Sequence, residues 1–249
     1  MAPSFFDENG FMRRIKKSDL GKAMIKDNSF ISKERGKEIV VDPEVEVICD
    51  GGALVNRVKW PRKCKISQVL HNYVAYIDNL VEKNSSKFNK VTIVFDGYLE
   101  KSTKDHTHKQ RYPVTSMEMV LSVDSDLQCE KDIFLSNPIN KQNFIDLLSQ
   151  NLVSKCMETI KYKKKDADVT IVNCAITKAM NKNAIIIGDD TDLLILAVHY
   201  IGELKPPNNV YMFRQSSNTY VDLKSVVSTI LEPVRSHFLA IHALSGVGM

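Results

Sequence analysis

Three short hydrophobic segments that each end in aspartate constrain the fold of this chain more than any other feature. They are VEVICD (45–50), KVTIVFD (90–96) and AIIIGDD (184–190). Apolar runs of this length, rich in Val and Ile and bounded by Gly and Asp, predict buried β-strands. We therefore expect three strands that each run into a turn carrying a carboxylate.

The segments between these strands predict helices. Residues 66–82 place apolar side chains at i, i+3, i+4 and i+7, which is the pattern of an amphipathic helix. Strand, helix and strand in succession indicate a βαβ unit and a parallel sheet. Further helices are expected at 141–160, 167–180, from 193 onward, at 226–231 and at 237–244. Two short strands, 210–213 and 219–221, are expected on either side of a turn at 215–218.

Composition and charge set the broad class of protein. The chain has 249 residues with 34 Lys and Arg against 30 Asp and Glu, so its net charge of +4 permits nucleic-acid binding without requiring it. We predict a basic N-terminal leader with one helix over residues 1–44 and one α/β domain over residues 45–249.

The same composition bears on location. No apolar run approaches the ~20 residues that a membrane span needs, so we expect no membrane association. The N-terminal residues lack the pattern of a secretory signal. Five cysteines without CxxC spacing fit reduced thiols. The sequence therefore predicts an intracellular protein, nuclear or cytoplasmic, and names no protein partner.

The aspartates that follow the strands predict a metal site. The carboxyl ends of parallel strands lie on one edge of a sheet, so Asp50, Asp96, Asp190 and Asp192 should converge there. Oxygen ligands without His or Cys suit Mg²⁺ or Mn²⁺, and two such ions ~4 Å apart are typical of phosphodiester hydrolysis. The alternative is that each Asp caps a helix or turn, which we favour for Asp189.

A series of acidic motifs resembles that of the PIN-like and flap-endonuclease (5′-nuclease) superfamily. The series comprises Asp50 after the first strand, VFDG at Asp96, KDADVTIV with Asp166 and Asp168, and the D-x-D at Asp190 and Asp192. The resemblance implies a three-layer PIN-like fold with a central, mainly parallel sheet flanked by helices. It also implies that Asp50, Asp96, Asp166, Asp190 and Asp192 hold Mg²⁺ or Mn²⁺, one or two ions, with Asp168 binding directly or through water. The substrate would be DNA or RNA.

The basic segment after VFDG is the candidate phosphate-binding region. In the family that this chain resembles, the corresponding segment carries Lys and Arg side chains that contact the scissile phosphate. The residues that this implies here are Lys101, Lys104, Lys109 and Arg111. A solvated loop of mixed charge is an equally good interpretation of the same segment.

The resemblance also implies a last Asp in a Gly-x-Asp-like turn, and the sequence departs from it there. The corresponding place is Leu244–Met249, which has no carboxylate, so we expect a copy truncated before that residue or a degenerate one. Two hypotheses follow: a metal-dependent nuclease, and a catalytically weakened nucleic-acid-binding module with the same fold. A haloacid-dehalogenase-type phosphatase is disfavoured because Gly52 stands where its nucleophilic D-x-D needs a second Asp.

Overall fold

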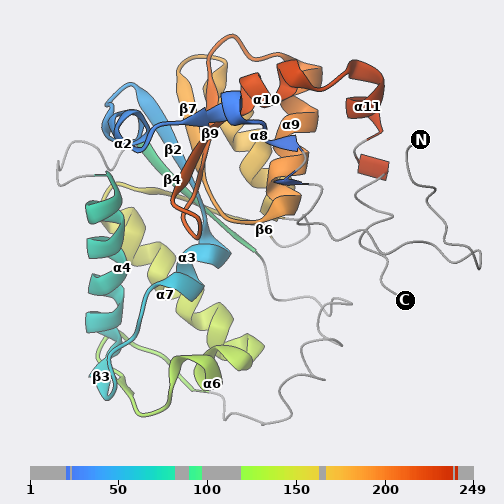
Figure 1. Cartoon of the computed structure of the whole chain (residues 1–249). Coiled ribbons are helices and arrows are strands. Elements are labelled where there is room, and N and C mark those ends of the chain that lie inside the picture. Colours follow the sequence, from blue (N-terminus) through green and yellow to red (C-terminus); the bar gives the residue numbers. More distant parts are fainter. Residues whose placement is uncertain are drawn as a thin grey trace, which may run out of the picture.

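The centre of the fold is a β-sheet (Figure 1). The computed structural model describes residues 21–22, 24–81, 90–96, 119–162, 167–237 and 239–240. The strands of the sheet are β1 (Phe30–Ile31), β2 (Val45–Asp50), β4 (Val91–Asp96), β6 (Glu158–Tyr162), β7 (Asn183–Ile187), β8 (Val210–Arg214) and β9 (Thr219–Asp222). The spatial order is β1-β9-β8-β7-β2-β4-β6. In this order, each strand from β8 through β7, β2 and β4 to β6 is parallel to its neighbour. At one edge of the sheet, β9 is antiparallel to β8 and β1 is antiparallel to β9. A separate antiparallel pair joins β3 (Cys64–Lys65) to β5 (Asp126–Leu127).

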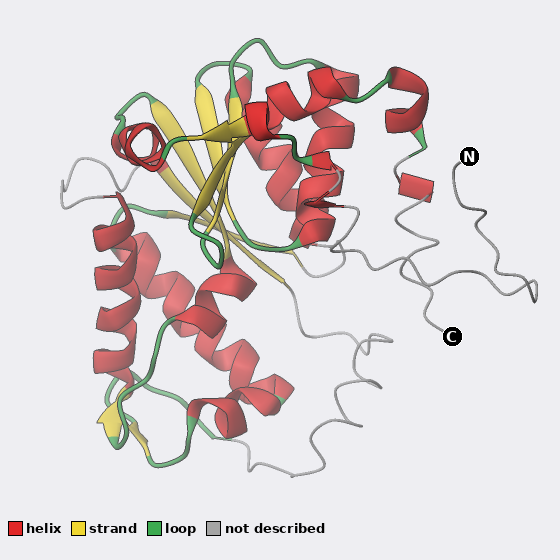
Figure 2. Cartoon of the chain, viewed as in Figure 1, coloured by secondary structure: helices red, strands yellow, loops and turns green. Residues whose placement is uncertain are grey.

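Helices cover both faces of the sheet (Figure 2). The first helical layer comprises α2 (Lys33–Val41), α3 (Gly51–Arg57), α4 (Ile66–Val81), α6 (Lys131–Ser136) and α7 (Pro138–Ser154). The second comprises α8 (Ala167–Ala179), α9 (Thr191–Leu204) and α10 (Leu223–Thr229). Two short elements complete the described chain, η1 (Asp27–Ser29) against α10 and α11 (Glu232–Ser236) against α9.

Two hydrophobic cores fill the space between these layers. Successive residues of a strand point to opposite faces, so in β2 Val47 and Cys49 enter the first core while Ile48 enters the second. Strands buried on both faces explain why the sequence shows continuous apolar runs instead of an alternating pattern. The protein therefore has an α/β fold in which a central, mainly parallel sheet is flanked by helices, as predicted.

Most of the expected elements are present. The helix predicted at 66–82 is α4, and the strands predicted at 45–49, 90–95 and 184–187 are β2, β4 and β7. The helix predicted at 141–160 is wrong in its last part, because α7 ends at Ser154 and β6 begins at Glu158. Cys156 has a φ of 65° between them, which reverses the chain.

The described part of the predicted leader packs onto the domain. β1 pairs with β9, and α2 contributes Ile39 and Val40 to the first core. Leu244–Met249, the place of the expected last Asp, lies outside the described residues. Among the helices that the structure describes, none is long and apolar enough to cross a membrane.

The end of α9 offers a stabilising substitution. Its C-cap Lys205 has the left-handed conformation (φ 46°, ψ 58°), which is strained for any residue with a Cβ. We expect Lys205→Gly to raise the free energy of unfolding by about 0.5–1 kcal/mol in urea denaturation. Lys155 is the matched control, because this C-cap of α7 has a φ of −100°. A gain of the same size from Lys155→Gly would show that the left-handed conformation is not the cause.

Candidate functional site

The carboxyl edge of the sheet brings together three of the predicted aspartates. Asp50 ends β2, Asp96 ends β4, and Asp190 follows β7 after Gly188 and Asp189. These three strands are adjacent and parallel, in the order β7-β2-β4. After β2, the chain adds β4 and then β6 on one side of β2. It then returns to the other side of β2, where it adds β7 and β8. Asp50 and Asp190 therefore flank the switch point of the sheet, where ligands of open α/β folds bind.

Gly51 allows β4 to pack closely against the start of α3, and Gly188 lies beside Leu193 and Asp50. A Cβ on Gly51 would lie 2.4 Å from Cδ1 of Phe95 and 2.6 Å from the carbonyl oxygen of Val94. A Cβ on Gly188 would lie 3.6 Å from Cβ of Asp50 and 2.7 Å from Cδ2 of Leu193. A side chain at Gly51 would therefore push β4 away, whereas one at Gly188 would displace the end of the Leu193 side chain and make only an ordinary contact with Asp50. The glycine after Asp50 thus serves close packing as well as turning.

Asp50 is both a helix cap and a buried carboxylate whose pKa is raised. Its Oδ1 accepts hydrogen bonds from the backbone N–H groups of Gly52 (2.8 Å) and Ala53 (3.1 Å) at the start of α3. Burial raises the pKa of Asp50, these two hydrogen bonds oppose that shift, and the negative charges of Asp96 and Asp190 raise the pKa further. Asp96 and Asp190 are therefore close enough to Asp50 for their charges to act on it.

Asp96 and Asp190 also accept hydrogen bonds from helix N-termini. Oδ1 of Asp96 accepts from the backbone N–H of Ala167, the first residue of α8, at 3.2 Å. Oδ1 of Asp190 accepts from the backbone N–H of Asp192 at 3.0 Å and caps α9. The expectation that Asp189 would cap this helix is therefore wrong, and Asp190 has that role.

Asp168 and Asp192 lie in the first turns of α8 and α9. Asp166, Lys101, Lys104, Lys109 and Arg111 lie outside the described residues. Within the parts of the chain that the structure describes, no three His, Cys, Asp or Glu side chains form a group that could hold a metal ion. The assignment of the six aspartates as ligands and of the four basic residues as phosphate contacts therefore stays a prediction.

Lys141 is a cation near this edge that the sequence analysis missed. It lies on the first turns of α7, and burial lowers its pKa while the charge of Asp96 opposes that shift. The charge of Lys141 therefore interacts with Asp96, one of the three carboxylates. No sequence signal could have found it, because a single Lys in a polar helix start is ordinary.

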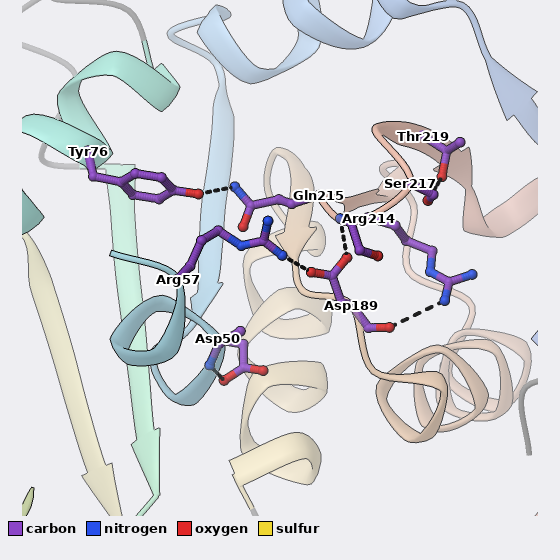
Figure 3. A network of polar contacts seen from close by, with 10 residues as sticks. Asp50, Arg57, Tyr76, Asp189, Arg214, Gln215, Ser217 and Thr219 are labelled. Carbon is purple, nitrogen blue, oxygen red and sulfur yellow. Dashed lines mark hydrogen bonds and ion pairs between the residues drawn. The ribbon is translucent and has the colours of Figure 1, made fainter. Parts of the chain in front are cut away.

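A second polar network extends the edge toward β8 (Figure 3). The guanidinium of Arg57, at the end of α3, forms an ion pair with the carboxylate of Asp189. Oδ1 of Asp189 accepts from the backbone N–H of Ser216 at 2.8 Å, and Nη2 of Arg214 donates to the Asp189 carbonyl oxygen at 3.3 Å. Nε2 of Gln215 donates to the hydroxyl of Tyr76 at 2.7 Å.

Tyr73 and Trp60 hold α3 in place through side-chain hydrogen bonds. The Tyr73 hydroxyl donates to the carbonyl oxygen of Val55 in α3 at 2.8 Å and accepts from Nε1 of Trp60 at 3.0 Å. Tyr73 is fully buried in α4, and burial raises the pKa of its hydroxyl. α3, whose N-cap is Asp50, is therefore fixed to the first core.

Comparisons with known proteins add little to this geometry. No protein-family model matches the chain, and the search of curated proteins found no match. Among solved structures, the chain is similar to T5 5′-exonuclease with bound divalent metal ions (zinc), with a TM-score of 0.39 and 16% sequence identity. The alignment covers 70% of this chain and 56% of the exonuclease chain. A likeness at this level assigns no function by itself.

Proposed function

We propose that this protein is a divalent-metal-dependent nuclease of the PIN-like or flap-endonuclease type, acting on DNA or RNA inside the cell. One observation carries the proposal: Asp50, Asp96 and Asp190 lie at the carboxyl ends of three adjacent parallel strands beside the switch point, and the charges of Asp96 and Asp190 both act on Asp50. Mutually repelling carboxylates in a partly buried edge are best stabilised by a cation.

The donor set fits Mg²⁺ or Mn²⁺. The described donors are carboxylate oxygens, which hard cations prefer, and Lys141 adds a positive charge near them. The proposed ligands are Asp50, Asp96, Asp166, Asp190 and Asp192, with Asp168 direct or through water. One or two ions held there would polarise the phosphodiester and lower the pKa of the attacking water. Lys101, Lys104, Lys109 and Arg111 are proposed to contact the substrate phosphates.

A weakened nucleic-acid-binding module is the second candidate. Asp50, Asp96 and Asp190 each already accept a backbone N–H, and among the described side chains no group of three is arranged to hold a metal ion. These carboxylates would then act as helix caps, and binding would occur without cleavage.

A cleavage assay separates the two candidates. Labelled single-stranded, flapped and duplex DNA and RNA are incubated with the purified protein in Mg²⁺, Mn²⁺ or EDTA. We expect metal-dependent cleavage that Asp192→Asn abolishes. Asp132→Asn is the matched control, because Asp132 is a first-turn acid of α6, a helix of the other layer, and should leave cleavage unchanged. Binding without cleavage in any metal would instead support the second candidate.

A further inference from the structure

The Arg57–Asp189 ion pair connects two turns that carry proposed metal ligands. Asp50 is the N-cap of α3 and Arg57 is its last residue, so one short helix carries both. Asp189 immediately precedes Asp190, the N-cap of α9. The ion pair therefore connects α3, which follows β2, to the turn that follows β7, on the two sides of the switch point (Figure 3).

Asp189 is held from several directions at once. Oδ2 of its carboxylate contacts Arg57, and Oδ1 accepts from the backbone N–H of Ser216. Its carbonyl oxygen accepts from Arg214, the last residue of β8. The side chains of Arg57 and Asp189 are 32% and 24% exposed, so the pair is partly shielded from water. Contacts from α3, from β8 and from the β8–β9 turn thus restrict the backbone just before Asp190.

We propose that Arg57 and Asp189 are a positioning pair that sets the separation of Asp50 and Asp190 and thereby the affinity for a divalent cation. The inference rests on the proposed function, because it assumes that these two carboxylates bind the ion. Groups that only orient metal ligands commonly change metal affinity by 10–100-fold, whereas partly exposed ion pairs contribute little to folding. Metal affinity is therefore the quantity that should respond to a change in the pair.

Direct Mn²⁺ binding to the full chain tests this role without any substrate. Isothermal titration calorimetry compares the wild type with Asp189→Asn, Arg57→Gln and the double variant. We expect each single variant to weaken Mn²⁺ binding by roughly 10–100-fold, and the double variant to be no weaker than the weaker single one. Arg57→Lys keeps the charge and should recover part of the affinity. Melting temperatures measured in EDTA check that each variant is folded.

Lys182→Gln is the matched control. It removes the Lys182–Glu44 ion pair of 2.9 Å, which joins the residues just before β7 and β2 at the opposite edge of the sheet. Mn²⁺ affinity should be unchanged in this variant. If the wild type binds Mn²⁺ and the Arg57 and Asp189 variants bind it equally well, the positioning role is wrong and the metal site stands. If the wild type binds no Mn²⁺, the proposed metal site is itself overturned, and the positioning role with it.

Discussion

Replacing Asp50 by asparagine is expected to abolish metal-dependent cleavage while leaving the fold as stable as before or more so. Asn keeps an oxygen that can accept from the N–H groups of Gly52 and Ala53, and Asn and Asp are about equally good N-caps. It lacks the charge that a hard cation needs. The loss of activity should be at least the ~10–100-fold typical of groups that only orient metal ligands.

The pH dependence of stability provides an independent measure of the same substitution. The pKa of Asp50 is raised, chiefly by burial, so its ionised form destabilises the native state at every pH above that pKa. The asparagine side chain carries no such charge, and Asp50→Asn should therefore unfold at higher urea concentration near neutral pH. The difference should shrink as Asp50 is protonated, which urea denaturation in EDTA between roughly pH 4 and 8 would show.

Asp222→Asn is the control for the cleavage measurement. Asp222 also ends a strand and caps a helix, accepting from the N–H groups of Lys224 (2.9 Å) and Ser225 (3.3 Å). Because β9 is antiparallel to β8, this residue lies at the opposite edge of the sheet. Cleavage should survive in Asp222→Asn. If it survives equally in Asp50→Asn, then Asp50 is a helix cap and not a metal ligand.

Phe144→Ala should cause the largest loss of stability. Phe144 of α7 is fully buried, and its ring centroid lies 4.7 Å from that of Trp60 and 5.6 Å from that of Tyr73. Its removal leaves a cavity that the rigid neighbouring rings cannot fill. We expect the free energy of unfolding to fall by about 3–5 kcal/mol, measured by urea denaturation.

A truncation on the exposed side of the same helix is the control. Ile139 is 45% exposed, and Ile139→Ala should change the free energy of unfolding by no more than about 0.5 kcal/mol. Equal losses from the two substitutions would mean that α7 contributes through helix propensity and not through this aromatic cluster.

The sequence predicted those parts of the fold that have a strong local pattern. The apolar runs before Asp50 and Asp96 identified two central strands, because strands buried on both faces need such runs. The helical period of 66–82 identified α4 for a similar reason. β6 was missed because its polar residues continue a helix-like segment, and parallel pairing with β4 decides its conformation.

The candidate site was predictable only in part. That Asp50, Asp96 and Asp190 share one edge follows from parallel topology. The Arg57–Asp189 ion pair joins residues 132 positions apart, so no local pattern could reveal it. The nearness of Lys141 to Asp96 likewise depends on how α7 packs. Asp190 caps α9 because it directly precedes the first helical residue, whereas Asp189 forms the ion pair with Arg57.

Each carboxylate of the central trio lies at the start of a helix, and this has a consequence for how the protein is loaded with metal. The N-termini of α3, α8 and α9 donate N–H groups to Asp50, Asp96 and Asp190, and the partial positive charge of such ends favours anions. The apo form thus compensates its negative edge in part, although the pKa of Asp50 is still raised. We therefore expect the protein to fold without the cation, in contrast to small zinc domains that are unfolded without their metal. The occupancy of the proposed metal site would then depend on the concentration of free cation around the already folded protein.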